Sequence, residues 1–215
     1  MALYDVGRVI VGGFFRLFFR VKITGRENIP DVNKRFVICA NHKSNLDPPM
    51  VGWAMPFEIG YMAKEELFHN KLFGALITKL GAFPIKRGKS DVSALRTAIS
   101  LVKDGKHIVV FPEGGRSHND RLRKGKMGAA MVAVKAKADI LPVGIEGGYK
   151  PFGRINVNIG KPIDLSGYHD KKLESGELQD ITDRLLMPAI SELSHIPMNK
   201  QQSIGGSEVN GHNNS

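Results

Sequence analysis

Short apolar runs recur through the middle of the chain, and each is bounded by turn-forming residues. Several runs are apolar at nearly every position, which indicates strands buried on both faces. Between them, apolar residues recur at the three-to-four-residue spacing of helices. The expected strands are Phe36–Ala40, Ile59–Ala63, Ala82–Ile85, His107–Phe111, Ile140–Ile145 and Ile155–Ile159. The expected helices are Leu46–Met55, Lys71–Leu80, Val92–Val102, Met127–Ala138 and Leu178–Leu193, the last of them interrupted by Pro188.

This alternation of strands and helices predicts an α/β domain. Its central sheet is expected to be mainly parallel, with helices on both faces. Val92–Val102 is the clearest helix, because Ser90 and Asp91 precede it as capping residues and Gly105 follows it. Functional side chains are then expected on the loops beyond the strand ends.

The N-terminal residues 1–20 follow a different pattern, with four Phe and three Arg in one expected helix. Their longest uncharged run, Val9–Phe15, has seven residues. A membrane-spanning helix needs about twenty, and interleaved charges do not suit a signal peptide. Arg8, Arg16 and Arg20 fall close to one helix face, and apolar residues cover much of the rest. This pattern favours an amphipathic helix at a membrane interface; the alternative is a helix packed on the domain's own core.

These patterns divide the chain of 215 residues into three parts. Residues 1–20 form the amphipathic membrane-association helix, and residues 21–198 form the folded domain. Residues 199–215 are polar and rich in Gly, Ser and Asn, so we expect a disordered tail. The single Cys39 excludes an intramolecular disulfide and a cysteine-based zinc site.

The charge balance of the chain indicates that its ligands are anionic. The chain has 31 Lys and Arg against 21 Asp and Glu, a net charge of +10. From Lys86 to Lys126 there are eleven basic and four acidic residues. Such a stretch attracts nucleic acid, an anionic membrane or a phosphorylated small molecule. Nucleic acid is not expected, because Phe111 is the only aromatic residue in this stretch.

One candidate for chemistry is the pair His42 and Asp47. On one helix the pair would lie about 140° apart and would not meet. A strand–loop–helix junction removes this difficulty, with Asp47 as the helix N-cap and Pro48 as its first residue. The loop would fold His42 back onto the carboxylate, which fixes the imidazole tautomer and leaves the other nitrogen as a base. The alternative is that Asp47 only caps the helix and His42 only completes the loop.

A His–Asp dyad needs a nucleophile. The chain has no G-x-S-x-G elbow and no reactive-cysteine signature. The simplest completion is a substrate hydroxyl, which His42 deprotonates and which then attacks an acyl group. Water in place of that hydroxyl would make the protein a hydrolase.

Three further blocks lie at or near strand ends. Lys86 and Arg87 follow the strand Ala82–Ile85 and suit phosphate binding. The following Gly88–Ser90 resembles the end of a P-loop, but Phe83 stands where the required first glycine would be, which excludes that motif.

The next block is Phe111–Ser117. Its glycines, Gly114 among them, allow the backbone to approach a ligand closely. Glu113 and Arg116 can both reach that ligand, Arg116 toward a phosphate and Glu113 toward a hydroxyl or as an orienting partner. The last block carries Pro142 near the start of a strand, which suggests a sheet edge or a strand beginning.

In this order the four blocks resemble the glycerolipid acyltransferase family, and within it the 1-acyl-sn-glycerol-3-phosphate acyltransferases. The resemblance covers roughly residues 25–161 and implies that His42 and Asp47 are the catalytic dyad. It implies that Pro142 lies on the acyl-donor side. The residues implied to bind the phosphate or the acceptor are Lys86, Arg87, Glu113, Gly114 and Arg116.

The implied reaction transfers a fatty acyl group from acyl-CoA or acyl-carrier protein to the free hydroxyl of lysophosphatidate, giving phosphatidate. No metal ion and no other cofactor is expected. The anionic acceptor and the Arg- and Phe-rich helix suggest a peripheral or monotopic protein on the cytoplasmic face of the cell membrane. Alternatives are an acyltransferase for glycerol 3-phosphate or another lysophospholipid, a lipid esterase, and a non-catalytic binder of anionic lipid.

Overall fold

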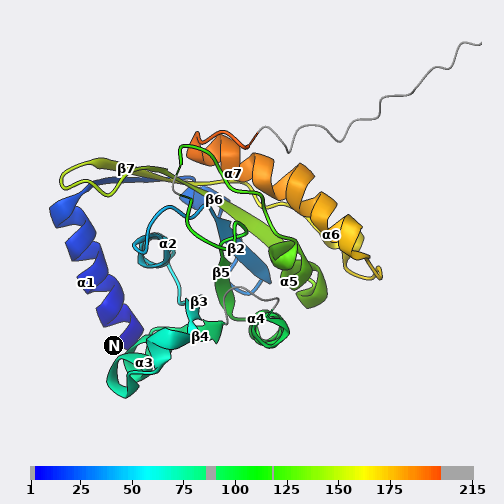
Figure 1. Ribbon diagram of the computed structural model, residues 1–215, viewed down its shortest axis with the longest axis horizontal. Coiled ribbons are helices and arrows are strands. Elements are labelled where there is room, and N and C mark those ends of the chain that lie inside the picture. Colours follow the sequence, from blue (N-terminus) through cyan, green and yellow to red (C-terminus); the bar gives the residue numbers. More distant parts are fainter. Residues whose placement is uncertain (1–2, 86–90, 118, 200–215) are drawn as a thin grey trace, which may run out of the picture.

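The computed structural model describes residues 3–85, 91–117 and 119–199. Within these ranges seven strands form one sheet, in the order β1-β7-β6-β2-β5-β3-β4 (Figure 1). All neighbouring pairs are parallel except β6 and β7, which are antiparallel. The strands are β1 (Arg20–Thr24), β2 (Phe36–Ala40), β3 (Ile59–Lys64), β4 (Ala82–Ile85), β5 (His107–Val110), β6 (Asp139–Gly147) and β7 (Arg154–Ile159).

Helices cover both faces of this sheet (Figure 1). The described α-helices are α1 (Leu3–Phe18), α2 (Asp47–Ala54), α3 (Lys71–Lys79), α4 (Val92–Lys103), α5 (Gly128–Ala136), α6 (Ser175–Ile181) and α7 (Met187–Ser194). Short 3-10 turns are η1 (Arg26–Asn28), η2 (Glu65–Phe68) and η3 (Ser166–Tyr168).

The central strand β2 shows how the sheet separates two cores. All five of its residues are buried, and successive side chains point to opposite faces. Val37 and Cys39 pack with residues of α4, α5 and α6 on one face. Phe36, Ile38 and Ala40 pack with α1 and α2 on the other. A strand buried on both faces must be apolar throughout, which explains why this run is visible in the sequence.

The expected α/β architecture is confirmed, with a mainly parallel sheet and helices on both faces. The six expected strands all form, but the sequence pattern missed a seventh, β1. This edge strand, Arg20–Thr24, alternates polar and apolar residues and has no buried position. It therefore lacks the continuous apolar run that marks the others. It also shortens the N-terminal helix, which ends at Phe18 and not at residue 20.

The last expected helix is a chain of three pieces. A π-helical turn, η4 (Thr182–Leu186), separates α6 from α7. Pro188 lies in the first turn of α7, where its missing N–H cannot bond to the carbonyl four residues earlier. The widened turn before it absorbs this defect. Of the expected disordered tail, residues 200–215 lie outside the described part of the chain.

Helix α1 packs on the domain through one face and exposes another. Phe15 is 1% exposed and stacks on Trp53 of α2, with 5.8 Å between ring centroids. Burial of such a ring stabilises the fold by about 1.5–3 kcal/mol. The exposed face is apolar: Leu3, Val6, Val9, Ile10, Phe14, Leu17 and Phe18. Among the described residues, no helix has the length and apolarity needed to cross a membrane.

The interpretation of α1 as a membrane-interface helix places its arginines toward the lipid headgroups, and the structure places them differently. Arg8 donates to the main-chain oxygen of Met55 at 3.1 Å, and the Arg16 guanidinium lies 5.4 Å from the Trp53 ring. Both therefore contact the domain. The helix has two apolar sides, and the sequence pattern alone did not separate them.

His107 generates a prediction about stability. Its ring stacks on Phe36 at 4.2 Å and Nε2 donates to the carbonyl of Val32, while burial lowers its pKa below the ordinary value. The unfolded chain then binds more protons than the folded one as the pH falls below about 6.5. We expect the free energy of unfolding of the wild type to be lower at pH 5.5 than at pH 7. This decrease should be smaller in His107→Phe.

Urea unfolding at both pH values measures this difference, with His69→Phe as the control at an exposed site. Equal pH dependence of the wild type and His107→Phe would contradict the assignment. The lost bond to Val32 lowers the stability of His107→Phe by about 1 kcal/mol at either pH, so only the pH dependence is diagnostic.

Candidate active site

His42 and Asp47 meet at the carboxyl end of β2. The Nδ1 atom of His42 lies 2.9 Å from Oδ2 of Asp47. His42 is 5% exposed and Asp47 is fully buried. A buried carboxylate accepts only, so Nδ1 carries the proton and Nε2 keeps a free lone pair. The imidazole is therefore oriented as a base, as the spacing of the two residues predicts.

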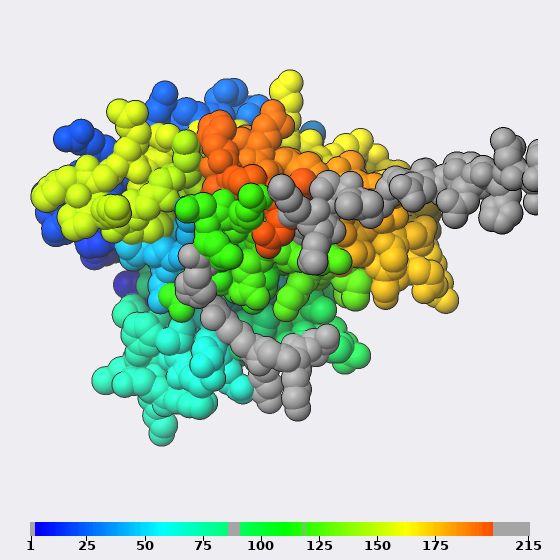
Figure 2. Space-filling view, turned by 45° about the horizontal axis from the view of Figure 1, so that its top comes forward, coloured from blue at the N-terminus to red at the C-terminus, as the bar shows by residue number. Residues whose placement is uncertain are grey.

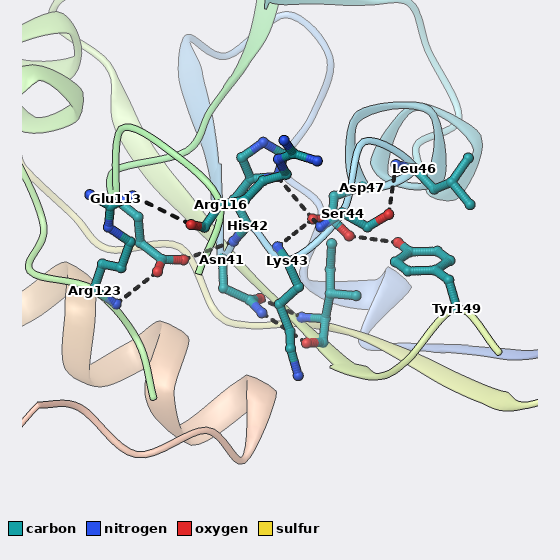
Figure 3. A network of polar contacts seen from close by, with 11 residues as sticks. Asn41, His42, Lys43, Ser44, Leu46, Asp47, Glu113, Arg116, Arg123 and Tyr149 are labelled. Carbon is teal, nitrogen blue, oxygen red and sulfur yellow. Dashed lines mark hydrogen bonds and ion pairs between the residues drawn. The ribbon is translucent and has the colours of Figure 1, made fainter. Parts of the chain in front are cut away.

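The Asp47 carboxylate is held by the loop that precedes it (Figure 3). Its Oδ2 accepts the backbone N–H groups of Lys43 at 2.6 Å and Ser44 at 2.7 Å. The expected N-cap role is wrong. Asp47 is the first residue of α2, Leu46 is the cap, and the carboxylate turns back to the loop rather than to the helix N–H groups. The chain therefore folds around the carboxylate, which brings His42 back to it.

Two residues of the segment after β5, and the neighbour of His42 after β2, support the His42 backbone and ring. Phe111, directly after β5, stacks on the imidazole with 4.2 Å between centroids. Asn41 exchanges two hydrogen bonds with the main chain of Ile145 and so ties β2 to β6. Glu113, 1% exposed, accepts the backbone N–H of His42 at 2.8 Å with one oxygen and that of Arg123 at 2.8 Å with the other. Burial raises the pKa of the Glu113 carboxyl, and these two donors oppose the rise.

A cavity of about 710 Å³ opens beside His42. This volume lies within the range of small-molecule sites, roughly 300–1,000 Å³. Its walls are mostly apolar and come from α1, α2, η2 and α3; examples are Val11, Trp53, Leu67, Phe73 and Ile77. The cavity therefore offers a hydrocarbon-like space that ends at the imidazole.

Cationic side chains line the same cavity. Arg8 comes from α1, Lys64 from the end of β3, and Arg116 from the loop after β5. The described residues hold no group of three or more His, Cys, Asp or Glu side chains that could bind a metal ion. The Lys64 ammonium is paired with Glu66 at 2.8 Å, so an anionic group in this cavity would meet positive charge mainly from Arg8 and Arg116.

Of the other expected site residues, some line the cavity, some do not, and two lie outside the described part of the chain. Gly114 and Arg116 line the cavity, as Gly115 does. Glu113 does not line it, because both its oxygens are turned to backbone N–H groups. Lys86 and Arg87 lie outside the described residues; Ile85, directly before them, lines the cavity.

Pro142 lies in the sheet and not on the cavity wall. It is the fourth of the nine residues of β6, a strand with neighbours on both sides, so of the two expected positions the sheet edge is wrong and a place in the first half of the strand is found. The ladder with β7 ends at Val143, and the missing N–H of Pro142 falls just outside it. Nothing in this position brings Pro142 to the reacting groups.

Sequence reasoning missed Arg8, Lys64 and Tyr149. Arg8 was assigned to lipid headgroups, and Lys64 follows a run that reads only as a buried strand. Tyr149 donates to the second oxygen of Asp47 at 2.6 Å from 102 residues away. No local pattern marks such a contact. The pair of glycines before Tyr149 was the available signal, because it indicates a turn directly after a strand.

The described residues thus bring together a buried His–Asp pair and a mostly apolar cavity that cationic side chains also line. Comparison with known proteins gives the class: residues 20–146 match the family model described as Acyltransferase. The chain belongs to this acyltransferase family.

Several characterised relatives are similar to the chain. The 1-acyl-sn-glycerol-3-phosphate acyltransferase of Streptococcus pneumoniae is 34% identical over 74% of this chain and 61% of its own length. The protein of the same name from Bacillus subtilis is 36% identical over 69% of this chain and 76% of its own length. The chain thus spans less than two thirds of the first relative.

A solved structure shares the fold. The crystal structure of the 1-acyl-sn-glycerophosphate (LPA) acyltransferase PlsC from Thermotoga maritima superposes with a TM-score of 0.68. The two are 28% identical, and the match covers 88% of this chain and 79% of that one.

The dyad geometry generates a second prediction. Asp47→Asn keeps the shape of the side chain but removes the negative charge that stabilises a protonated His42. We expect the acyl-transfer rate to fall by about 10²–10⁴-fold, the range of general-base catalysis. One oxygen still accepts the loop N–H groups, so the melting temperature should fall by only a few degrees.

Steady-state kinetics and calorimetry on the same preparation separate the two effects. Asp31→Asn, in an exposed loop turn, is the control substitution. A fully active Asp47→Asn enzyme would remove Asp47 from the mechanism.

Proposed function

We propose that this chain transfers a fatty acyl group from an acyl thioester to the free hydroxyl of 1-acyl-sn-glycerol 3-phosphate and forms phosphatidate. The relatives that carry this name support the acceptor. The observation that carries the proposal is the dyad at the meeting point of an apolar cavity and three cations, Arg8, Lys64 and Arg116. Such a site suits a molecule with a long hydrocarbon chain, a hydroxyl and a phosphate.

The reaction follows from the orientation of the imidazole. Nε2 of His42 takes the proton of the acceptor hydroxyl while Asp47 stabilises the charge that forms on the ring. The oxygen attacks the thioester carbonyl, and the tetrahedral intermediate then expels the thiolate. The thiolate takes the proton from His42, which regenerates the base. Phosphatidate and the free thiol of CoA or acyl-carrier protein are the products.

The cations act on the acceptor's phosphate. Arg116 has a planar fork that binds two phosphate oxygens, whereas Lys64 supplies a point charge. Both line the cavity with His42, so a phosphate between them places the glycerol close to the base. Gly114 and Gly115 allow the backbone of the same loop to approach the ligand.

The exposed apolar face of α1 supports a membrane-surface location, on the cytoplasmic side where acyl thioesters occur. The face consists of Leu3, Val6, Val9, Ile10, Phe14, Leu17 and Phe18. Other exposed apolar residues, Leu67, Leu72, Phe73 and Leu76, lie in η2 and α3. Since residues of α1, η2 and α3 also line the cavity, a bilayer in contact with them would lie next to its apolar part.

The test of function uses purified protein, 1-oleoyl lysophosphatidate and radiolabelled palmitoyl-CoA or palmitoyl-carrier protein. We expect labelled phosphatidate from the wild type and at least a 10²-fold lower rate from His42→Ala, because the base is lost. His195→Ala, at the exposed end of α7, is the control and should retain full activity.

Product analysis distinguishes the alternatives. Free palmitate in place of phosphatidate would make the protein an esterase. Faster acylation of glycerol 3-phosphate or lysophosphatidylcholine would change the acceptor. Unaltered activity of His42→Ala would refute the mechanism.

Membrane binding generates a further prediction. Replacing Ile10 and Leu17 with Gln removes two apolar side chains from the exposed face of α1. We expect binding to phosphatidylglycerol vesicles to weaken about 10-fold or more, since each buried leucine-sized side chain contributes about 1.5–3 kcal/mol. Vesicle co-sedimentation measures it, and Leu185→Gln, on η4, is the control. Unchanged binding of the double variant would exclude α1 as the docking surface.

A further inference from the structure

Tyr149 contacts the catalytic acid from a part of the fold with no other role in the site. It lies in the connection between β6 and β7, and its hydroxyl donates to Oδ1 of Asp47 at 2.6 Å. The other oxygen, Oδ2, already accepts from His42, Lys43 and Ser44. Figure 3 shows the phenol ring approaching Asp47 from the side opposite His42. Among the described residues, Tyr149 is therefore the hydrogen-bond donor to Oδ1, the carboxylate oxygen of Asp47 that does not contact His42.

The Tyr149 hydroxyl keeps its proton and donates a hydrogen bond to Asp47. Burial, and then the neighbouring Asp47 carboxylate, raise the pKa of this phenol far above its ordinary value. It therefore remains protonated throughout the working pH range. A neutral O–H bonded to a carboxylate stabilises the negative charge and fixes the plane of the group.

The ring of Tyr149 packs against one ring of helix α1 and one ring directly after the helix. Phe19 meets it edge-on, with centroids 5.7 Å apart and planes at 86°, and Phe15 lies at 6.5 Å. Phe15 also stacks on Trp53, in the helix that begins at Asp47. These four rings form an aromatic cluster, Phe15, Phe19, Trp53 and Tyr149, that joins α1 to α2 and to the β6–β7 connection.

Main-chain bonds support the same junction. The N–H of Phe152 donates to the carbonyl of Phe18 at 2.6 Å, and that of Arg20 donates to the carbonyl of Gly153 at 2.9 Å. Figure 2 shows the yellow-green residues of this connection beside the blue N-terminal helix, at the end of the molecule away from α6. The end of α1 and the segment that carries Tyr149 are therefore joined through the main chain as well as through their rings.

We propose that Tyr149 is a positioning residue that orients the Asp47 carboxylate and reduces its pull on the His42 proton, and that the ring of Phe19, directly after α1, keeps Tyr149 in place. The inference rests on the proposed function, because it assigns the dyad a catalytic role. It makes α1 part of the support of the active site as well as a candidate membrane contact.

The expected electrostatic effect has a definite sign. Loss of the Tyr149 hydroxyl leaves more negative charge on Asp47, which favours the protonated form of His42. The base then stays protonated to a higher pH. Other charged or titratable groups face the dyad or its cavity and are unchanged by this substitution: Lys43, Glu113, Arg116, Arg8, Lys64, Tyr4 and Tyr61.

The test is Tyr149→Phe, which removes the hydroxyl and keeps the ring. We expect kcat to fall about 10-fold with the KM for acyl-CoA within twofold, and the acid limb of kcat/KM against pH to move up by about half a unit. Tyr168→Phe, on η3, is the matched control. A role in stability alone would lower the melting temperature and leave the acid limb in place, and that result would overturn the proposal.

A second measurement does not depend on the substrate. The Hε1 resonance of His42, assigned with the His42→Gln spectrum, is titrated by NMR in the wild type and in Tyr149→Phe. We expect its midpoint at higher pH in the variant. An equal midpoint would overturn the inference, whereas a wild type that acylates no lysophosphatidate would overturn the proposed function instead.

The contact of Tyr149 with Phe19, directly after α1, is tested with Phe19→Leu. Loss of the edge-on ring should move the acid limb in the same direction as Tyr149→Phe, but by less. It should cause no further shift when combined with Tyr149→Phe, since both act through one hydrogen bond. Phe18→Leu, on the exposed face, is the control. Additive shifts in the double variant would show that Phe19 acts by another route and would overturn this part of the proposal.

Discussion

The site depends on one constraint, the burial of the Asp47 charge. The carboxylate is fully buried, and an ion in a protein interior costs several kcal/mol unless it is paired and hydrogen-bonded. Four donors offset this cost: two loop N–H groups, the imidazole and the Tyr149 hydroxyl. They come from the end of β2, the loop after it and the β6–β7 connection. The dyad therefore forms only when these segments have all reached their native positions.

Glu113 is a second buried carboxylate that is stabilised by hydrogen bonds from backbone N–H groups. Its buried carboxylate joins the backbone of His42 to that of Arg123, so it connects the base to the loop that carries Gly114 and Arg116. The resemblance to the family assigned it to the acceptor, whereas its geometry supports the loops that would hold the acceptor. Glu113 thus fixes the position of His42 relative to this loop through backbone hydrogen bonds.

Much of the sheet and the dyad could be predicted from the sequence, because both leave local signals. Buried parallel strands require continuous apolar runs such as Phe36–Ala40, and the spacing of His42 and Asp47 allows a loop but not a helix. The missed features depend on contacts between distant residues. The apolar residues of the edge strand β1 are only partly buried, Arg8 reaches Met55, and Tyr149 reaches Asp47. In α1 the pattern showed apolar residues over most of the helix, and contacts with distant residues such as Trp53 and Tyr149 determine that Phe15 faces inward.

The same arrangement favours transfer of the acyl group over its hydrolysis. His42 is 5% exposed and covered by Phe111 on one ring face, so its free nitrogen is reached through the cavity that it lines. Most of that wall is apolar and binds water poorly, whereas hydrocarbon fills it favourably. An acyl chain in the cavity therefore displaces water from the base as the substrate hydroxyl arrives. In the mechanism proposed above no protein nucleophile takes part, so no acyl-enzyme would form that water could attack afterwards, and the cations beside His42 would select the acceptor.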